Sequence, residues 1–149
     1  MCIRDSAYGP RDRFDPQRSH VIPALIEKAI NTTGGIFSVR GSGKASRAFI
    51  YVEDFARGVI EVAARIPGAN PVNIGVDEEV TIEELARRIA DLTNELTDRR
   101  PEPLFETDAK EGQPRRNCDT RKAKRLLGFE ARVSLNEGLR RTMEWYLDQ

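Results

Sequence analysis

Residues 48–66 read AFIYVEDFARGVIEVAARI, and this stretch sets the expected fold class because a strand pattern passes directly into a helix pattern. Residues 48–52 are β-branched or aromatic apart from the first alanine, a composition that favours strands. Glu53 or Asp54 then offers a carboxylate that can cap the start of a helix. Helical spacing predicts one buried face on that helix, formed by Phe55, Val59, Val62 and Ile66.

A second helix is expected nearer the N-terminus, over residues 21–31. Ser19 is its expected cap, and Pro23 is tolerated in its first turn because an amide there has no helical partner. Two consecutive glycines end it, and a short strand follows over residues 36–39. That strand leads into the turn Gly41–Gly43, so a hairpin is plausible here.

The clearest helix start lies at Thr81, with Glu84 three residues later. This spacing is that of a capping box, in which the two side chains satisfy amides at the helix start and contribute about 1 kcal/mol. Brief strands are expected on either side of this helix, at residues 72–75 and 104–106. The acidic run Asp77–Glu79 is expected to be a solvated turn.

The C-terminal segment also has helical patterns. A short helix at residues 123–127 is expected to end at Gly128, and Ser134 with Glu137 repeats the capping-box spacing before the last helix. Since strands alternate with helices along the chain, an α/β or α+β unit is expected. The strands are too few for a self-sufficient doubly wound sheet.

The composition argues against several classes of function. The 149 residues include 24 Lys and Arg and 24 Asp and Glu, so the formal net charge is zero, and neither a nucleic acid nor a membrane surface is an expected partner. Apolar runs are far shorter than the roughly 20 residues that span a bilayer. The two cysteines, Cys2 and Cys118, lie far apart without neighbouring ligands, so neither a disulfide framework nor a metal site is expected. A reducing, cytoplasmic location fits this usage.

Residues 1–7 differ from the sequence that follows, because they contain neither turn chemistry nor an apolar period. We expect them to be a non-native or truncated leader, with a native N-terminal arm as the alternative. Residues 8–149 are then expected to form the functional unit.

Two cationic loops are prominent in this neutral chain. Arg40, Lys44 and Arg47 surround the glycine turn, and Arg115 and Arg116 lie in a second loop that contains Gly and Pro. Converging loops of this kind would hold a diphosphate, because one guanidinium donates to two phosphate oxygens at once. The alternative is that they are solvated charges on a highly charged surface.

The glycine turn is not a P-loop. Ser38 stands where the Walker pattern needs glycine, and Ala45 stands where it needs a hydroxyl group. No G-x-G-x-x-G follows a strand either, so this chain contains no dinucleotide fingerprint.

His20 is the single histidine, so any imidazole acid–base chemistry of this chain depends on it. It lies between a polar loop and a helix start, where an imidazole could exchange protons with a ligand near neutral pH. The spacing alone equally fits a surface or capping histidine.

Several longer phrases resemble those of a known family. Residues 8–16 read YGPRDRFDP, residues 19–26 read SHVIPALI, and residues 112–116 read GQPRR. The first two closely resemble the middle of GDP-L-fucose synthases, while the third, with the glycine turn and Asn73–Gly75, resembles the wider pattern of their superfamily. These enzymes are extended short-chain dehydrogenases/reductases, the NAD-dependent epimerase/dehydratase family.

The resemblance implies an α/β fold, in which the last Rossmann elements join a small α/β substrate-binding domain and the N-terminal Rossmann core is missing. It implies 3,5-epimerisation and 4-reduction of GDP-4-keto-6-deoxymannose, a nucleotide-diphosphate sugar. The cofactor is NADP(H), with NAD possible, bound mainly by the missing half. The full-length enzyme is expected to be a homodimer, and this chain alone is expected to be inactive.

The resemblance also implies roles for particular residues. His20 matches the general acid of the epimerisation, near the nicotinamide, and Tyr8 is expected beside the cofactor. Lys28, Arg47 and Arg116 match basic residues that hold the GDP moiety.

The two cationic loops add Arg40 and Arg115 to the expected substrate-binding residues. Arg40 departs from the family pattern, which has an aromatic residue there, so the identity of the sugar nucleotide stays open. A UDP-sugar 4-epimerase or a nucleotide-sugar dehydratase is the nearby alternative. A non-catalytic adaptor that binds a partner through its arginine-rich loops is the alternative from another class.

Overall fold

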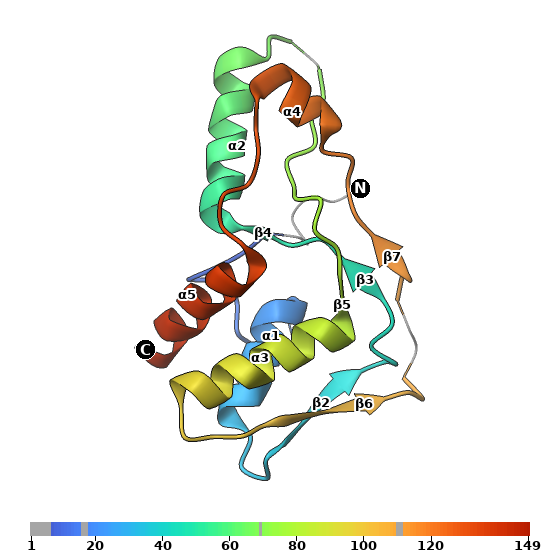
Figure 1. The fold of residues 1–149 in the computed structure, drawn as a ribbon, viewed down its shortest axis with the longest axis vertical. Helices are drawn as coiled ribbons and strands as arrows, with labels where there is room; N and C mark the ends of the chain where they lie inside the picture. The colour runs from blue at the N-terminus through green and yellow to red at the C-terminus, as the bar shows by residue number, and fades with distance from the viewer. Residues whose placement is uncertain (1–6, 16–17, 69, 110–111) are drawn as a thin grey trace.

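The computed structural model describes residues 7–15, 18–68, 70–109 and 112–149, and Figure 1 shows their arrangement. The chain has a mixed α/β fold in which helices α2 and α4 lie at one end of an elongated molecule and α1 and α3 lie at the other. The expected leader falls on residues 1–6, outside the described ranges, and on Ala7, which lies in a strand. The leader therefore stays a prediction.

In the described ranges the helices have 7 to 15 residues, whereas the strands have only two or five. The helices are α1 (Val21–Asn31), α2 (Val52–Arg65), α3 (Ile82–Leu96), α4 (Arg121–Leu127) and α5 (Leu135–Leu147). The strands are β1 (Ala7–Tyr8), β2 (Ile36–Arg40), β3 (Ser46–Arg47), β4 (Ile50–Tyr51), β5 (Val80–Thr81), β6 (Glu102–Glu106) and β7 (Arg115–Arg116). β1 pairs with β4 and β2 with β6, both in parallel, while β3 lies between antiparallel β5 and parallel β7.

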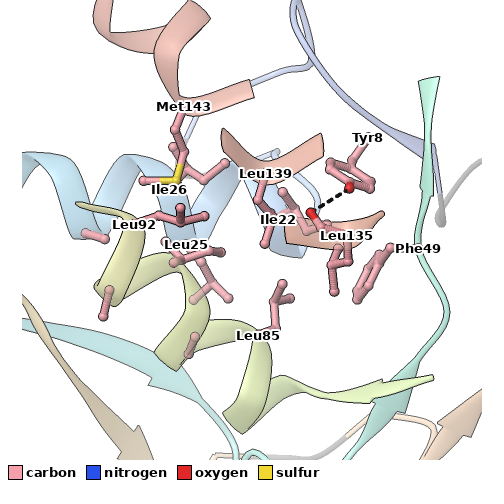
Figure 2. Packing of buried hydrophobic residues seen from close by; sticks show 14 of the residues in the cluster. Tyr8, Ile22, Leu25, Ile26, Phe49, Leu85, Leu92, Leu135, Leu139 and Met143 are labelled. Atoms are coloured by element: carbon pink, nitrogen blue, oxygen red, sulfur yellow. Dashed lines mark hydrogen bonds between the residues drawn. The ribbon is translucent and has the colours of Figure 1, made fainter. Parts of the chain in front are cut away.

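The larger hydrophobic core lies where α1, α3 and α5 meet. Ile26, Leu85, Leu139 and Met143 have no exposed surface, and Figure 2 shows them packed together from these three helices. Burial of each such side chain contributes about 1.5–3 kcal/mol. This core fixes α3, the helix that begins beside the three-stranded sheet.

A buried carboxylate joins α2 to the loop before α5. Asp54 accepts hydrogen bonds from the main-chain N–H groups of Arg132 and Val133, at 2.7 and 2.8 Å, and from Nη2 of Arg57 at 2.6 Å. Burial raises the pKa of Asp54, but these hydrogen bonds outweigh it and hold the pKa below its usual value. The expectation that Glu53 or Asp54 caps α2 is wrong, because the N-cap is Tyr51, two or three residues earlier, and both carboxylates lie in the first turn.

The helix starts at Thr81 and Ser134 are confirmed. Thr81 Oγ1 accepts from the N–H of Glu84 at 3.1 Å, and the Glu84 carboxylate accepts from the N–H of Thr81 at 2.8 Å. Ser134 Oγ accepts from the N–H of Glu137, but the Glu137 carboxylate binds Arg141, so the described bonds form half of a box.

Other local expectations need correction. The cap of α1 is His20 rather than Ser19. The prediction of a hairpin after residues 36–39 is wrong, because β2 pairs in parallel with β6, which is distant in the sequence. Residues 72–75 are not in a strand, and the apolar pattern there reflects burial of Ile74 in a second core cluster beside α2 and α4. On α2, Val59 is 48% exposed, although the other three predicted residues of its face pack against that cluster.

Within the described ranges, no helix combines the length and the apolar character that crossing a bilayer requires. The expected cytoplasmic location stays a prediction.

Candidate functional site

The three-stranded sheet brings the two cationic loops side by side. On the parallel strands β3 and β7, Arg47 lies opposite Arg116, and Ser46 lies opposite Arg115. Opposite residues of a strand pair point to the same face, and successive residues point to opposite faces. Arg47 and Arg116 therefore share one face of the sheet, as the converging-loop hypothesis requires.

Both arginines of this pair are held by the loop before β7. Arg47 donates from Nη1 to the main-chain oxygen of Ser46 at 2.6 Å and from Nη2 to that of Gln113 at 2.8 Å. Nε of Arg116 donates to Oε1 of Gln113 at 3.2 Å. Burial, and then the positive charge of Arg116, lower the pKa of Arg47. Two cations held this close favour an anion as ligand.

A cavity of about 470 Å³ opens beside this pair. It is lined by Arg40, Gly41, Ser42, Gly43, Ala45, Ile82 and Gly112. A Cβ added at Gly112 would lie 3.9 Å from Nη2 of Arg47, so the guanidinium of Arg47 lies next to one residue of the cavity lining. Its volume falls within the range of about 300–1,000 Å³ that small-molecule sites occupy.

The glycine turn that lines the cavity is held firmly in place. The oxygen of Gly43 accepts from the N–H of Glu83 at 3.0 Å, and the oxygen of Ala45 accepts from the N–H of Ile82 at 2.9 Å. Gly43 has φ +78°, and a Cβ there would lie 2.7 Å from the ring of Phe105. Both the conformation and the close approach require glycine at this position.

The opposite face of the same strands contains an ion-pair network around Glu79. The Glu79 carboxylate accepts from Nε and Nη2 of Arg115, at 2.8–3.0 Å, from Oγ of Ser46, and from Nδ2 of Asn117 at 3.2 Å. These bonds, those of Arg115 first, lower the pKa of Glu79 to about 2. Glu79 was expected to lie in a solvated turn, and no sequence signal marks it as an anchor.

The network determines how the structure places Arg115. Its guanidinium faces Glu79, away from the arginine pair. Arg115 is therefore not brought together with Arg47 and Arg116, and a direct substrate contact of Arg115 stays a prediction.

Lys28 lies apart from the arginine pair, along β2. Its Nζ donates to the main-chain oxygen of Ser38 at 2.9 Å and to Oγ of Ser38 at 3.1 Å. These contacts of Lys28 satisfy a strand carbonyl, and its expected binding to the nucleotide stays a prediction.

The two residues expected beside the cofactor lie in different surroundings. The ring of Tyr8 is buried in the larger core, and its hydroxyl donates to the main-chain oxygen of Leu135 at 3.2 Å (Figure 2). A cofactor contact through this side chain does not fit its burial. His20 is exposed at the start of α1, and no described contact joins its imidazole to the arginine pair or to the cavity.

The comparisons with known proteins agree with the resemblance seen in the sequence. The model of the NAD dependent epimerase/dehydratase family matches residues 3–75. GDP-L-fucose synthase 1 of Arabidopsis thaliana is 37% identical over 144 residues, which are 94% of this chain and 43% of that protein. UDP-glucuronic acid decarboxylase 1 of Danio rerio is 40% identical over 142 residues, covering 95% of this chain and 32% of the relative.

A solved structure shows the same fold. The GDP-L-fucose synthetase of Naegleria fowleri, bound to NADP, superposes with a TM-score of 0.86 and 28% identity over 96% of this chain and 44% of that one. This chain thus spans less than half the length of each of these relatives.

Proposed function

Since this chain belongs to the NAD dependent epimerase/dehydratase family, we propose that it is the sugar-nucleotide-binding part of a GDP-L-fucose-synthase-like epimerase/reductase. The proposed substrate is GDP-4-keto-6-deoxymannose, and the proposed reaction of the full-length enzyme is 3,5-epimerisation followed by 4-reduction. The full-length enzyme is proposed to act as a homodimer.

The observation that supports this proposal is the pairing of Arg47 with Arg116 beside the cavity. A diphosphate offers negative oxygens to both guanidiniums, and each charge-assisted hydrogen bond contributes about 1.5–3 kcal/mol. We propose that these two arginines bind the diphosphate and that Arg40, which lines the cavity, contacts the nucleotide or the sugar.

The acid–base part of the proposal depends on His20. Its exposed imidazole is free of a side-chain cap bond to the helix start, so it is accessible to a sugar. We propose that it supplies the proton during epimerisation, when the full-length enzyme holds the hexose next to α1.

The ring of Tyr8 is buried, and no glycine-rich fingerprint follows a strand in the sequence. We therefore propose that NADP(H), or NAD, is bound mainly by parts of the full-length protein that this chain does not include. The cofactor would supply the hydride for reduction at C4. The 149-residue chain is accordingly proposed to show no turnover, which an NADPH-oxidation assay with the keto sugar tests.

UDP-sugars are the second candidate class of substrate. The observation that favours them is the identity of 40% to a UDP-glucuronic acid decarboxylase. Calorimetric titration of the chain with GDP and with UDP distinguishes the two classes. Tighter binding of GDP supports the fucose-synthase-like proposal, tighter binding of UDP supports the alternative, and binding of neither supports a non-catalytic adaptor.

A further inference from the structure

Glu79 connects the two strands that present the arginine pair. Its carboxylate accepts from Ser46 on β3 and from Arg115 on β7, the residues directly before Arg47 and Arg116. We propose that Glu79 is a positioning residue for the diphosphate site, which sets the separation of Arg47 and Arg116 from the opposite face of the sheet. This inference rests on the proposed function.

The arginine pair needs such a connection. β3 and β7 pair over only two residues each, and like charges directly opposite each other destabilise a strand pair. The main-chain bond from the N–H of Ser46 to the oxygen of Pro114, at 2.8 Å, lies at the start of this short ladder. The Glu79 carboxylate adds side-chain bonds that oppose the repulsion.

Glu79 is also well placed to act as an anchor. It directly precedes β5, where Val80 is buried in the larger core and lies opposite Arg47. The capping box at Thr81 then fixes the start of α3, whose buried face belongs to the same core. β7, in contrast, follows a loop, and both of its residues are at least partly exposed. The Glu79 carboxylate thus links β7, through β5, to the larger core.

The alternative is that Glu79 and Arg115 form only a surface ion pair. Exposed pairs of this kind contribute little to the free energy of unfolding, and the Arg115 side chain is 69% exposed. A purely structural pair would change neither the affinity for an anion nor its dependence on Arg116. The two interpretations therefore predict different binding data.

The first experiment is calorimetric titration of the 149-residue chain with GDP, comparing the wild type with Glu79→Gln. The amide keeps the size of the side chain but loses its charge. We expect Glu79→Gln to weaken GDP binding about tenfold with an unchanged melting temperature. Glu61→Gln, which breaks an exposed ion pair with Arg65 on α2, is the matched control and should leave the affinity unchanged.

A double-mutant cycle tests whether Glu79 acts through the arginine pair. In an Arg116→Ala background, Glu79→Gln should change the GDP affinity by less than about twofold. In an Arg115→Met background, Glu79→Gln should likewise leave the GDP affinity unchanged, because the bonds between Glu79 and residue 115 are already lost. A full additional loss in either background would overturn the inference.

Hydrogen exchange at the Ser46 amide, measured without ligand, separates this inference from the proposed function. We expect Glu79→Gln to lower protection of that amide, because its bond to Pro114 loses the neighbouring support. If the wild type binds no nucleoside diphosphate, the proposed function fails and the inference fails with it. If the wild type binds GDP and Glu79→Gln binds it equally well, or Ser46 protection is unchanged, only the inference is overturned.

Discussion

Arg47 and Arg116 are register partners on β3 and β7, and both donate hydrogen bonds to Gln113, one to its main-chain oxygen and the other to its side-chain oxygen. The two guanidiniums thus approach each other from distant parts of the sequence. Their mutual repulsion is visible in the lowered pKa of Arg47, to which Arg116 contributes after burial. An anion bound between them would relieve this repulsion, which is why the pair supports diphosphate binding.

Removal of the buried Asp54 carboxylate should destabilise the fold. Asp54→Asn leaves two main-chain N–H groups and Arg57 with a weaker, partly mismatched acceptor. We expect the free energy of unfolding to fall by about 3 kcal/mol, as when one partner of a buried charged network is lost. Urea denaturation of the wild type and of Asp54→Asn measures this difference. Asp98→Asn, at an exposed position, is the control and should change little.

The same carboxylate should make stability depend on pH. The folded-state pKa of Asp54 is lowered, so its stabilisation is present above the unfolded value of about 3.9 and is lost as the pH falls through the folded value. Between neutral pH and pH of about 3, wild-type stability should therefore fall more steeply than that of Asp54→Asn. Parallel pH profiles for the two proteins would show that Asp54 does not contribute this dependence.

Two glycines with similar backbone conformations allow packing to be separated from strain. Gly43 has φ +78° and a Cβ there would meet Phe105 at 2.7 Å, whereas Gly68 has φ +68° and nothing within 4 Å. Gly68→Ala should lower the free energy of unfolding by about 1 kcal/mol, because of the backbone conformation alone. Gly43→Ala should lower it by about 1–3 kcal/mol more, because the added methyl group also meets Phe105. Thermal unfolding measures both. Equal losses would mean that the glycine turn tolerates a side chain next to the cavity.

The two capped helices should respond differently to loss of the cap. Thr81→Ala removes the hydroxyl that accepts from the N–H of Glu84 and donates to the Glu84 carboxylate, whereas Ser134→Ala removes a hydroxyl whose described bond is the one from the N–H of Glu137. We expect the free energy of unfolding to fall by about 1–2 kcal/mol for Thr81→Ala and by about 0.5–1 kcal/mol for Ser134→Ala. A larger loss at Ser134 in chemical denaturation would show that the bond from the Thr81 hydroxyl to the Glu84 carboxylate adds no stability.

The helix starts could be predicted from the sequence where their signals are local. Thr81 and Ser134 lie three residues from the acidic residues that complete their patterns, and α3 and α5 begin directly after them. The sheet pairing could not be predicted in this way. β2 and β6 are parallel and far apart in the sequence, and a parallel pair leaves no hairpin turn to identify it.

The candidate site could be predicted in part. The charge clusters beside glycines pointed to two loops, and the structure brings Arg47 and Arg116 together. Which of two adjacent arginines faces that site depends on strand register, and a shift of one residue exchanges the faces. The sequence therefore gave no means of separating Arg115, which faces Glu79, from Arg116.

The most direct measurement of the central claim is calorimetric titration of GDP into the wild-type chain and into Arg47→Ala and Arg116→Ala. Arg65→Ala, which removes an exposed arginine from the far end of α2, is the matched control. We predict that GDP binds the wild type and Arg65→Ala equally, and that each of the other substitutions weakens binding by about tenfold or more. Equal affinity of all four proteins for GDP would contradict the claim that Arg47 and Arg116 together bind the diphosphate.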